Sequence, residues 1–292
     1  MRIAQSDAIT EARTVRKELL DRLIIEEEQE LASKLEKCGN ALTLICSSCG
    51  NRHFTETRCK QKWCPVCVRA IATKRSLKFA AAAEAMQWPL FLTLTVENVK
   101  DTAIPFVRKL RRDFGRLRHR RLWKVNVRGG VAAIEVTNKG KGWHPHLHAL
   151  IDCRWLAIKT PRPQAGESSE HTKQKLRAAK HELTNLWKKV TREKFGVCWL
   201  QRASGIEAAR EVLKYSVKGS DLIESPDPIG PLIHQLCATR LTTSFGSLFG
   251  KHLTNGANEK TPVICDACGN FPEWIPEELV DNYQRKTAVI LR

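Results

Sequence analysis

The sequence predicts an α+β fold, in which helices pack behind an antiparallel sheet and a zinc-binding extension forms from both ends of the chain. Leu90–Val96 alternates large apolar residues with threonine, as a strand with one buried face does, and Val131–Thr137 predicts a second strand. A third strand is predicted at Gly142–Ile151, which carries three alternating histidines. Eight of the eleven cysteines fall in tight groups near the two ends of the chain, which indicates metal sites rather than isolated thiols.

Composition favours a nucleic-acid partner. The 292 residues are 42% hydrophobic, enough for a real core in one large domain or two ordinary ones. Lys and Arg number 49 against 31 Asp and Glu, a formal net charge of +18, which favours a polyanion. No apolar segment approaches the roughly 20 residues of a spanning helix, and no signal-peptide core is present at the N-terminus. We therefore expect a cytoplasmic protein without a membrane partner.

The clustered cysteines predict two zinc sites. A disulfide framework is not expected, because the cytosol keeps thiols reduced. Eight cysteines suffice for two tetrahedral sites. The two CxxC units, Cys46/Cys49 and Cys64/Cys67, are separated by 14 residues, a spacing typical of a zinc ribbon.

Two groupings of these cysteines are possible. Residues 46–50 (Cys-Ser-Ser-Cys-Gly) and 265–269 (Cys-Asp-Ala-Cys-Gly) are near copies of one knuckle, and like knuckles often share an ion. We therefore prefer one set of Cys46, Cys49, Cys265 and Cys268 and a second of Cys38, Cys59, Cys64 and Cys67, over a grouping local in sequence. The turns of this zinc module are surrounded by basic residues, so we expect the module to contact the DNA backbone. These residues are Arg58, Lys60, Lys62, Arg69, Lys74 and Arg75.

Helical periodicity and breakers place the remaining elements. Residues 1–37 predict an amphipathic helix with a possible interruption, and Val68–Met86 a helix that ends before Pro89. Pro105–Arg121 predicts a basic helix, and a loop at 159–173 precedes a helix from about Gln174 to Lys194. The expected organisation is an N-terminal arm (1–37), a zinc module with its helix (38–87), a sheet domain (88–250) and a C-terminal zinc-knuckle tail (251–292).

The histidine segment predicts a metal site on a strand. Alternate side chains of a strand share one face, so His144, His146 and His148 lie together while Trp143 and Leu147 pack on the other side. Neutral imidazole is a common metal ligand, although a buried structural histidine would show the same alternation. A proline inside the segment predicts an edge strand, or a bulge where the strand begins.

A neighbouring carboxylate can complete this site. The polar turn Asn138–Gly142 joins Val131–Thr137 to the histidine strand as a hairpin. Counting back across the turn places Glu135 opposite Pro145 or His146, as a further ligand or as an ordinary solvated glutamate. Histidine with carboxylate favours Mn²⁺ or Mg²⁺ over zinc, and the nitrogen ligands favour Mn²⁺.

A further candidate functional segment, from Ser204 to Gly219, is predicted to be a helix. Ser204 and Glu207 match a capping box, and Gly219 is a suitable C-terminal stop. Ile206, Ala209, Leu213 and Val217 form its packing stripe at helical spacing.

A tyrosine lies opposite this stripe. Tyr215 has Glu211 one turn before it and Lys214 and Lys218 beside it, which favours a nucleophile near charged groups. The alternative is an exposed, inert tyrosine.

Together these residues resemble the single-tyrosine HUH endonucleases, specifically the plasmid rolling-circle replication initiator (Rep) proteins. The similarity runs in order from Cys38 to Gly250. It comprises the cysteine segment Cys38–Cys67, a first strand motif Phe91–Thr95, the His-Pro-His-hydrophobe-His motif His144–Leu150, the Glu-x-x-Lys-Tyr-x-x-Lys motif Glu211–Lys218 and, more weakly, Arg240–Phe249. The knuckles at 46–49 and 265–268 depart from the family pattern.

The resemblance implies a ferredoxin/RRM-like palm that nicks and joins one DNA strand. Tyr215 would form a 5′-phosphotyrosine and free a 3′-hydroxyl, with Lys214 and Lys218 stabilising negative charge and Glu211 acting as general base at termination. Mn²⁺ or Mg²⁺ is expected on His146 and His148, completed by His144 or Glu135. The implied partners are single-stranded or hairpin origin DNA, a host helicase and a polymerase.

Two other classes share part of this pattern. A rolling-circle transposase would carry the histidine and tyrosine motifs, but many have paired tyrosines, and here only Tyr215 lies in the motif. A non-enzymatic zinc-ribbon DNA-binding protein would explain the charge and the cysteines but not the histidine strand.

Overall fold

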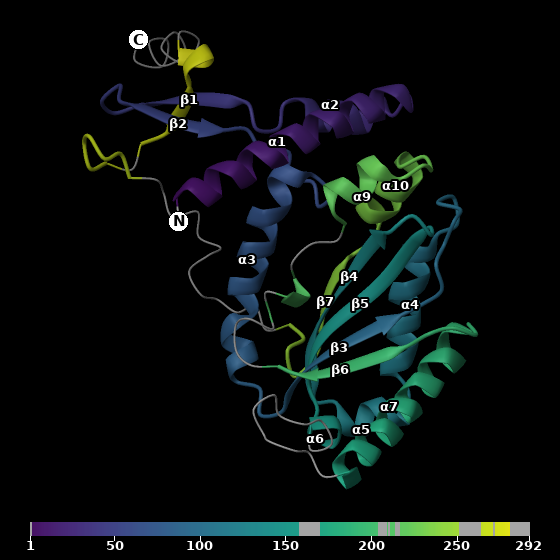
Figure 1. Cartoon of the computed structure of the whole chain (residues 1–292). Helices are drawn as coiled ribbons and strands as arrows, with labels where there is room; N and C mark the ends of the chain where they lie inside the picture. The colour runs from purple at the N-terminus through teal and green to yellow at the C-terminus, as the bar shows by residue number, and fades with distance from the viewer. Residues whose placement is uncertain are drawn as a thin grey trace.

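A five-stranded antiparallel sheet forms the centre of the computed structural model, which describes residues 2–157, 170–203, 209, 211–213, 217–250, 264–270 and 272–280. The strand order is β6-β3-β5-β4-β7, so the histidine-bearing strand is central (Figure 1). The strands are β3 (Pro89–Thr95), β4 (Gly129–Asn138), β5 (Trp143–Asp152), β6 (Cys198–Arg202) and β7 (Thr242–Gly246). The predicted combination of helices with an antiparallel sheet is confirmed.

Helices lie on both faces of this sheet. α4 (Phe106–Arg118) and α7 (Glu170–Thr191) cover one face, and α3 (Pro65–Glu84) lies on the other (Figure 1). The basic helix expected at 105–121 is split, because Arg120 adopts an extended conformation between α4 and α5 (Arg121–Asn126). Within the described ranges, no helix is long and apolar enough to cross a membrane.

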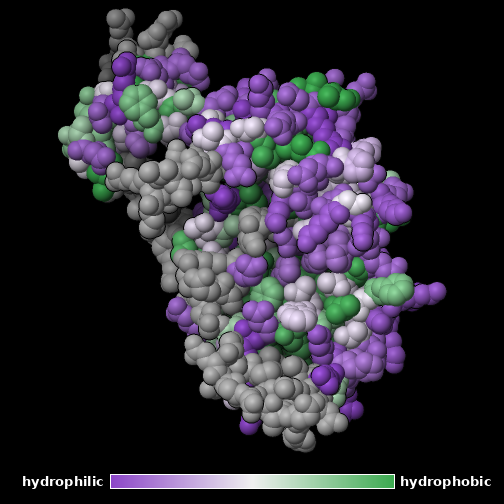
Figure 2. Space-filling model, viewed as in Figure 1, coloured by the Kyte–Doolittle hydropathy of each residue, from purple (hydrophilic) through white to green (hydrophobic). Residues whose placement is uncertain are grey.

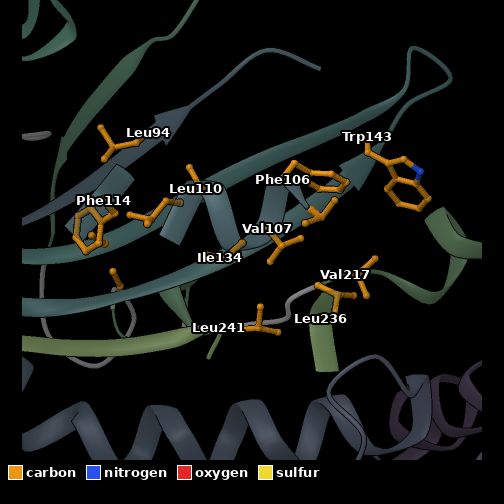
Figure 3. Packing of buried hydrophobic residues seen from close by; sticks show 14 of the residues in the cluster. Leu94, Phe106, Val107, Leu110, Phe114, Ile134, Trp143, Val217, Leu236 and Leu241 are labelled. Atoms are coloured by element: carbon orange, nitrogen blue, oxygen red, sulfur yellow. The ribbon is translucent and has the colours of Figure 1, made fainter. Parts of the chain in front are cut away.

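The main core lies between the sheet and α4. Leu94 of β3 and Ile134 of β4 face Phe106, Leu110 and Phe114 of α4, and all five side chains are buried (Figure 3). Each fully buried side chain of this size contributes about 1.5–3 kcal/mol relative to exposure. This packing uses one face of the strands, so the opposite face is available for polar side chains.

A second, smaller sheet joins the two ends of the chain. Its order is β2-β1-β8, with β1 (Ala41–Cys46), β2 (Arg52–Glu56) and β8 (Trp274–Pro276), followed by the short helix η1 (Glu277–Leu279). β8 pairs antiparallel with β1 through Leu44–Pro276, Ile45–Ile275 and Cys46–Trp274. The C-terminal strand therefore lies beside the N-terminal hairpin, at a distance from the central sheet (Figure 1).

The N-terminal helix is interrupted, as expected. α1 (Arg2–Ile25) and α2 (Gln29–Glu36) are separated at Glu27, which has a left-handed φ of 60°. α1 packs against α9 (Gly219–Glu224), which is followed by α10 (Gly230–Ala238). Leu19 and Leu23 are fully buried, so this arm is part of the main core.

Two charged side chains, Arg22 in the last turn of α1 and Glu26 just after it, bind the backbone of these later helices. Arg22 donates to three carbonyl oxygens, those of Leu222 and Ile223 (2.8 Å each) and Asp227 (2.6 Å). Glu26 accepts hydrogen bonds from the N–H groups of Ile229 (2.9 Å) and Gly230 (3.0 Å), at the start of α10. Arg22 and Glu26 also form an ion pair of 3.0 Å. We call this pair the Arg22–Glu26 clamp.

Candidate active site and metal sites

The β4–β5 hairpin positions the three histidines on one face. Glu135 lies directly opposite His146, Thr137 opposite His144 and Ala133 opposite His148. The predicted placement of Glu135 opposite Pro145 or His146 is therefore confirmed for His146. Because opposite residues of an antiparallel pair point to the same side, Glu135 shares the histidine face.

The prediction of an edge strand is wrong, because β5 pairs with both β3 and β4. The pairing of β3 ends at Thr95–His146, so Pro145 is paired only with Val136 of β4. A single bridge between Val99 and Trp143 resumes contact on the β3 side. Proline cannot donate to a ladder, and here it occupies the gap between these contacts.

Hydrogen bonds fix two of the imidazole rings. His148 Nε2 lies 2.8 Å from Glu135 Oε2, and its Nδ1 lies 3.0 Å from Thr93 Oγ1. His146 Nε2 lies 3.0 Å from Thr137 Oγ1. The His144 and His146 rings are close, with centroids 4.1 Å apart. Both nitrogens of His148 are thus engaged, one by a carboxylate and one by a hydroxyl.

Burial keeps two of these histidines neutral. Desolvation lowers the pKa of His146 to about 4 and also lowers the pKa of His144. At neutral pH both rings therefore carry a lone pair, the state in which imidazole binds a metal.

The donor chemistry of this face suits Mn²⁺ or Mg²⁺, but the side chains do not converge on one point. Imidazole nitrogen with carboxylate oxygen is a donor set that both ions accept, Mn²⁺ more readily. Among the described residues, the groups whose ligand atoms all lie within 4.8 Å of one another are two sets of cysteines. In the histidine face, Glu135 and His148 are adjacent while His146 Nε2 is engaged by Thr137.

Apolar side chains cover the adjoining part of the histidine face. Val131, Ala133 and Leu150 of the sheet pack in one cluster with Ala83 of α3 and with Ala209, Val212 and Leu213. Ala209, Val212 and Leu213, which follow β6 in the sequence, thus lie on the histidine face of the sheet.

The predicted helix from Ser204 to Gly219 is not continuous. Leu213 lies in a turn, Val217 forms a parallel bridge with Val136, and Lys218 is extended with ψ 140°. Gly219 begins α9 instead of ending a helix, so the predicted stop is wrong. The reason is tertiary: Val217 is buried in the main core beside β4, which outweighs local helical propensity.

Only part of the tyrosine motif can be located. Glu211 is helical and exposed, and Lys218 is exposed at the N-terminus of α9. Tyr215 and Lys214 lie outside the described residues, as do Ser204 and Glu207 of the capping box. The helical spacing that relates Glu211 to Tyr215 in the sequence does not extend to Lys218.

The first cysteine set has the geometry of a zinc site. Sγ–Sγ distances are 3.6 Å for Cys38–Cys64, 3.4 Å for Cys38–Cys67 and 3.7 Å for Cys59–Cys67. A tetrahedron with Zn–S bonds of 2.3 Å has edges of about 3.8 Å. Hydrogen bonds from the Cys59 and Cys64 thiols hold the pKa of Cys67 far below its usual range, so a thiolate is favoured there.

The second set unites the two ends of the chain. Sγ atoms of Cys46 and Cys268 lie 3.9 Å apart, and those of Cys49 and Cys265 3.6 Å apart. All four ligand atoms lie within 4.8 Å of one another, as in the first set. The grouping of like knuckles is confirmed over the sequence-local one, and both sets can hold structural zinc.

Comparison with known proteins agrees with the motifs. Residues 51–156 match the family model described as Replication protein. This segment is therefore similar to a replication protein. No curated protein and no solved structure matches the chain significantly. The replication-protein segment contains β3, Glu135 and all three histidines, whereas the tyrosine motif and the C-terminal knuckle lie beyond it.

Several residues that surround the three histidines of β5 are not evident from sequence motifs. Thr93 and Thr137 contact His148 and His146 directly. The alternation of threonine in Leu90–Val96 indicates the face on which Thr93 lies, but the partner of Thr93 depends on which strands pair. Strand β6 and its exposed Trp199 were also missed, although Phe195, Val197 and Trp199 alternate with buried residues.

Proposed function

We propose that the chain is a single-tyrosine HUH endonuclease that nicks and joins one DNA strand at a plasmid origin, in the cytoplasm, to begin and end rolling-circle replication. The observation that carries this proposal is the placement of Glu135 on the same face as His146 and His148, inside the replication-protein segment. Rolling-circle replication begins at a free 3′-hydroxyl that serves as primer, and strand cleavage by a tyrosine supplies one.

Tyr215 is the proposed nucleophile. It precedes Val217 by two residues, and Val217 is bridged to Val136, the neighbour of Glu135. Covalent geometry keeps the Tyr215 Cα within about 7 Å of the Val217 Cα. In the step, the phenolic oxygen bonds to phosphorus and the bond from phosphorus to the 3′-oxygen breaks, which leaves a 5′-phosphotyrosine and a 3′-hydroxyl.

Other residues of the chain support this attack. His146, His148 and Glu135, with His144 as the alternative ligand, would hold Mn²⁺ or Mg²⁺. The ion, when bound, would neutralise charge on the scissile phosphate. An ordinary phenol has a pKa near 10, so Lys214 and Lys218 are proposed to stabilise the negative charge near Tyr215. Glu211, which is exposed, is the proposed general base for the water that ends the cycle.

The proposed substrate is single-stranded or hairpin DNA. The net charge of +18 suits a polyanion, and hydrophilic side chains cover most of the described surface in the view of Figure 2. A host helicase and a polymerase are the partners that a nicked origin requires.

A covalent-adduct assay tests this function. The protein is mixed with Mn²⁺ and a labelled single-stranded oligonucleotide from the plasmid's own origin, and the products are separated on a denaturing protein gel. We expect an adduct band from the wild-type chain and none from Tyr215→Phe, because the phenolic oxygen is the bonding atom. The double variant His146→Ala/His148→Ala should also give no adduct, since the cation ligands are lost.

The second tyrosine of the chain provides a matched control. Tyr283→Phe removes the same atom outside the motif and should give the wild-type adduct yield. Circular dichroism confirms that each variant is folded. A normal adduct from Tyr215→Phe would exclude this tyrosine as nucleophile, and undiminished adduct from the double histidine variant would exclude the metal site.

A further inference from the structure

The edge of the central sheet exposes an alternating apolar row. Phe195, Val197 and Trp199 are 73%, 53% and 55% exposed, whereas the residues between and after them, Gly196, Cys198 and Leu200, are buried. Edge strands usually carry polar or charged side chains on their open face, because exposed apolar edges invite aggregation. An apolar row in this position therefore indicates a binding surface.

This row shares the histidine face of the sheet. Trp199 is paired with Thr93 of β3, and Thr93 is paired with His148 of β5. Directly paired residues point to the same side, so Trp199 and His148 lie on one face. Two strand spacings separate them, about 10 Å.

Val197 lies in the next row of paired residues across the sheet, on the same face as Trp199. The Thr95 N–H donates to the Val197 carbonyl at 3.0 Å, and the Val197 N–H donates to Thr95 Oγ1 at 3.1 Å. Thr95 is itself paired with His146. The two rows that carry His148 and His146 thus end at the sheet edge in Trp199 and Val197.

A cation accompanies the aromatic side chain. Lys180 Nζ, on α7, lies 4.3 Å from the centroid of the Trp199 ring. Trp199 keeps more than half of its surface exposed despite this contact. A flat apolar ring beside an ammonium group matches the two parts of an unpaired nucleotide, the base and the phosphate.

We propose that Phe195, Val197, Trp199 and Lys180 form a stacking platform for unpaired bases of the DNA strand, next to the phosphate that is cleaved. The identity of the strand rests on the proposed function. Stacking suits this surface because every base has an apolar face, and the chain's positive charge complements the backbone. A duplex keeps its base faces stacked internally, so the platform selects single-stranded DNA.

A binding experiment without cleavage tests the platform. Fluorescence anisotropy of a labelled oligo(dT) strand, which lacks the origin sequence, is measured without added Mn²⁺ or Mg²⁺ before and after substitution of Trp199, so that the structural zinc sites stay filled. Trp199→Ala should raise the Kd for single-stranded DNA about 10-fold, within the roughly 5- to 150-fold range of one lost base stack. Trp199→Phe should bind nearly as the wild type does, and duplex DNA of equal length should bind all three proteins alike.

Two further variants separate stacking from charge and from general surface effects. Val125→Ala removes an apolar side chain of α5 that is 71% exposed and should leave the Kd within about 2-fold. Lys180→Gln should reduce the slope of log Kobs against log salt by about 0.7, the contribution of one phosphate contact on a single strand. Phe195→Ala provides an independent test of the same row if Trp199→Ala does not fold.

Three outcomes would overturn the platform. The first is wild-type affinity for single-stranded DNA in folded Trp199→Ala or, where that variant does not fold, in Phe195→Ala. The second is equal loss of single-stranded and duplex binding. The third is that Trp199→Ala changes the sedimentation coefficient of the protein but leaves its DNA binding unchanged. That result would make this row an interface between copies of the chain. Because no step requires cleavage, failure of the wild type to form an adduct would remove the proposed nuclease function and leave this test intact.

Discussion

Thr93 is the residue that links β3 to the histidine face. Its hydroxyl lies 3.0 Å from His148 Nδ1, while Glu135 engages Nε2 of the same ring. A partner on the second nitrogen fixes the tautomer and the orientation of a metal-binding histidine. Thr93 is therefore a positioning residue for the proposed cation site, although it donates no ligand itself.

Replacing Thr93 by valine should weaken cation binding while leaving the fold intact. Valine keeps the β-branched shape and removes the hydroxyl, so His148 loses its orienting partner. We expect Mn²⁺ affinity to fall about 10- to 100-fold, as for other residues that orient a ligand. Isothermal titration calorimetry with Mn²⁺ gives the affinity. Thr43→Val, on β1 in the distant ribbon, is the matched control, and equal affinities in the two variants would show that Thr93 does not position His148.

Local patterns were sufficient to predict much of this face. The alternation of His144, His146 and His148 and the short turn before them determine the hairpin register, so the position of Glu135 followed from counting. Thr93 could not be assigned a partner in this way, because its contact depends on β3 pairing with β5 more than 50 positions away. Nonlocal strand order also explains why Pro145 suggested an edge strand incorrectly.

At the scale of elements, the Arg22–Glu26 clamp fixes the helices that follow the tyrosine motif. Arg22 binds the carbonyl end of α9 and the turn after it, and Glu26 binds the N–H groups at the start of α10. A cation at helical carbonyls and an anion at helical N–H groups both oppose the local backbone charge. Since α9 begins two residues after Val217, the N-terminal arm helps to hold the end of the tyrosine segment.

Removal of the clamp arginine should destabilise the chain. Arg22 is only 19% exposed, so Arg22→Ala leaves three carbonyl groups without their charged donor. The loss should be about 1.5–3 kcal/mol in the free energy of unfolding, the usual range for hydrogen bonds to charged groups. Urea denaturation followed by circular dichroism measures it. Lys34→Ala, which removes an exposed i,i+4 ion pair with Glu30, should give no measurable change. A result for Arg22→Ala as small as that of Lys34→Ala would show that the clamp contributes nothing.

The elements that sequence periodicity missed are short or determined by tertiary contacts. β6 and β7 have five residues each, too few for a clear alternation to stand out. The stretch from Ser204 to Gly219 has good helix signals at both ends, yet Val217 forms a bridge with Val136 instead of lying in a helix. By contrast, α3 and α7 were predicted because long apolar or mixed runs end at clear breakers.

At the scale of the whole molecule, two cysteine sets that can hold zinc flank the small β2-β1-β8 sheet, which is too small to be stable by packing alone. β8 has three residues, and a sheet of this size buries little apolar surface. Zinc in the second set would join β1 to the C-terminal strand through Cys46, Cys49, Cys265 and Cys268. We therefore expect the ribbon to depend on zinc more than on packing.

The zinc content of variants tests this arrangement. Elemental analysis should find two zinc ions per wild-type chain and one in Cys265→Ser/Cys268→Ser, because two ligands cannot retain a structural ion. Cys46→Ser/Cys49→Ser should lose the same single ion. Cys237→Ser, which is exposed and outside both sets, should keep two. Two ions in the Cys265/Cys268 variant would contradict the grouping.

The joining of β8 to β1 also imposes an order on biosynthesis. Cys46 and Cys268 are 222 positions apart, so the first knuckle emerges from the ribosome long before its partner. Until then Cys46 and Cys49 lack two ligands, while the local set from Cys38 to Cys67 can be filled early. The second zinc ion would therefore enter last, and its entry would report that translation has passed the replication-protein segment and the tyrosine motif intact.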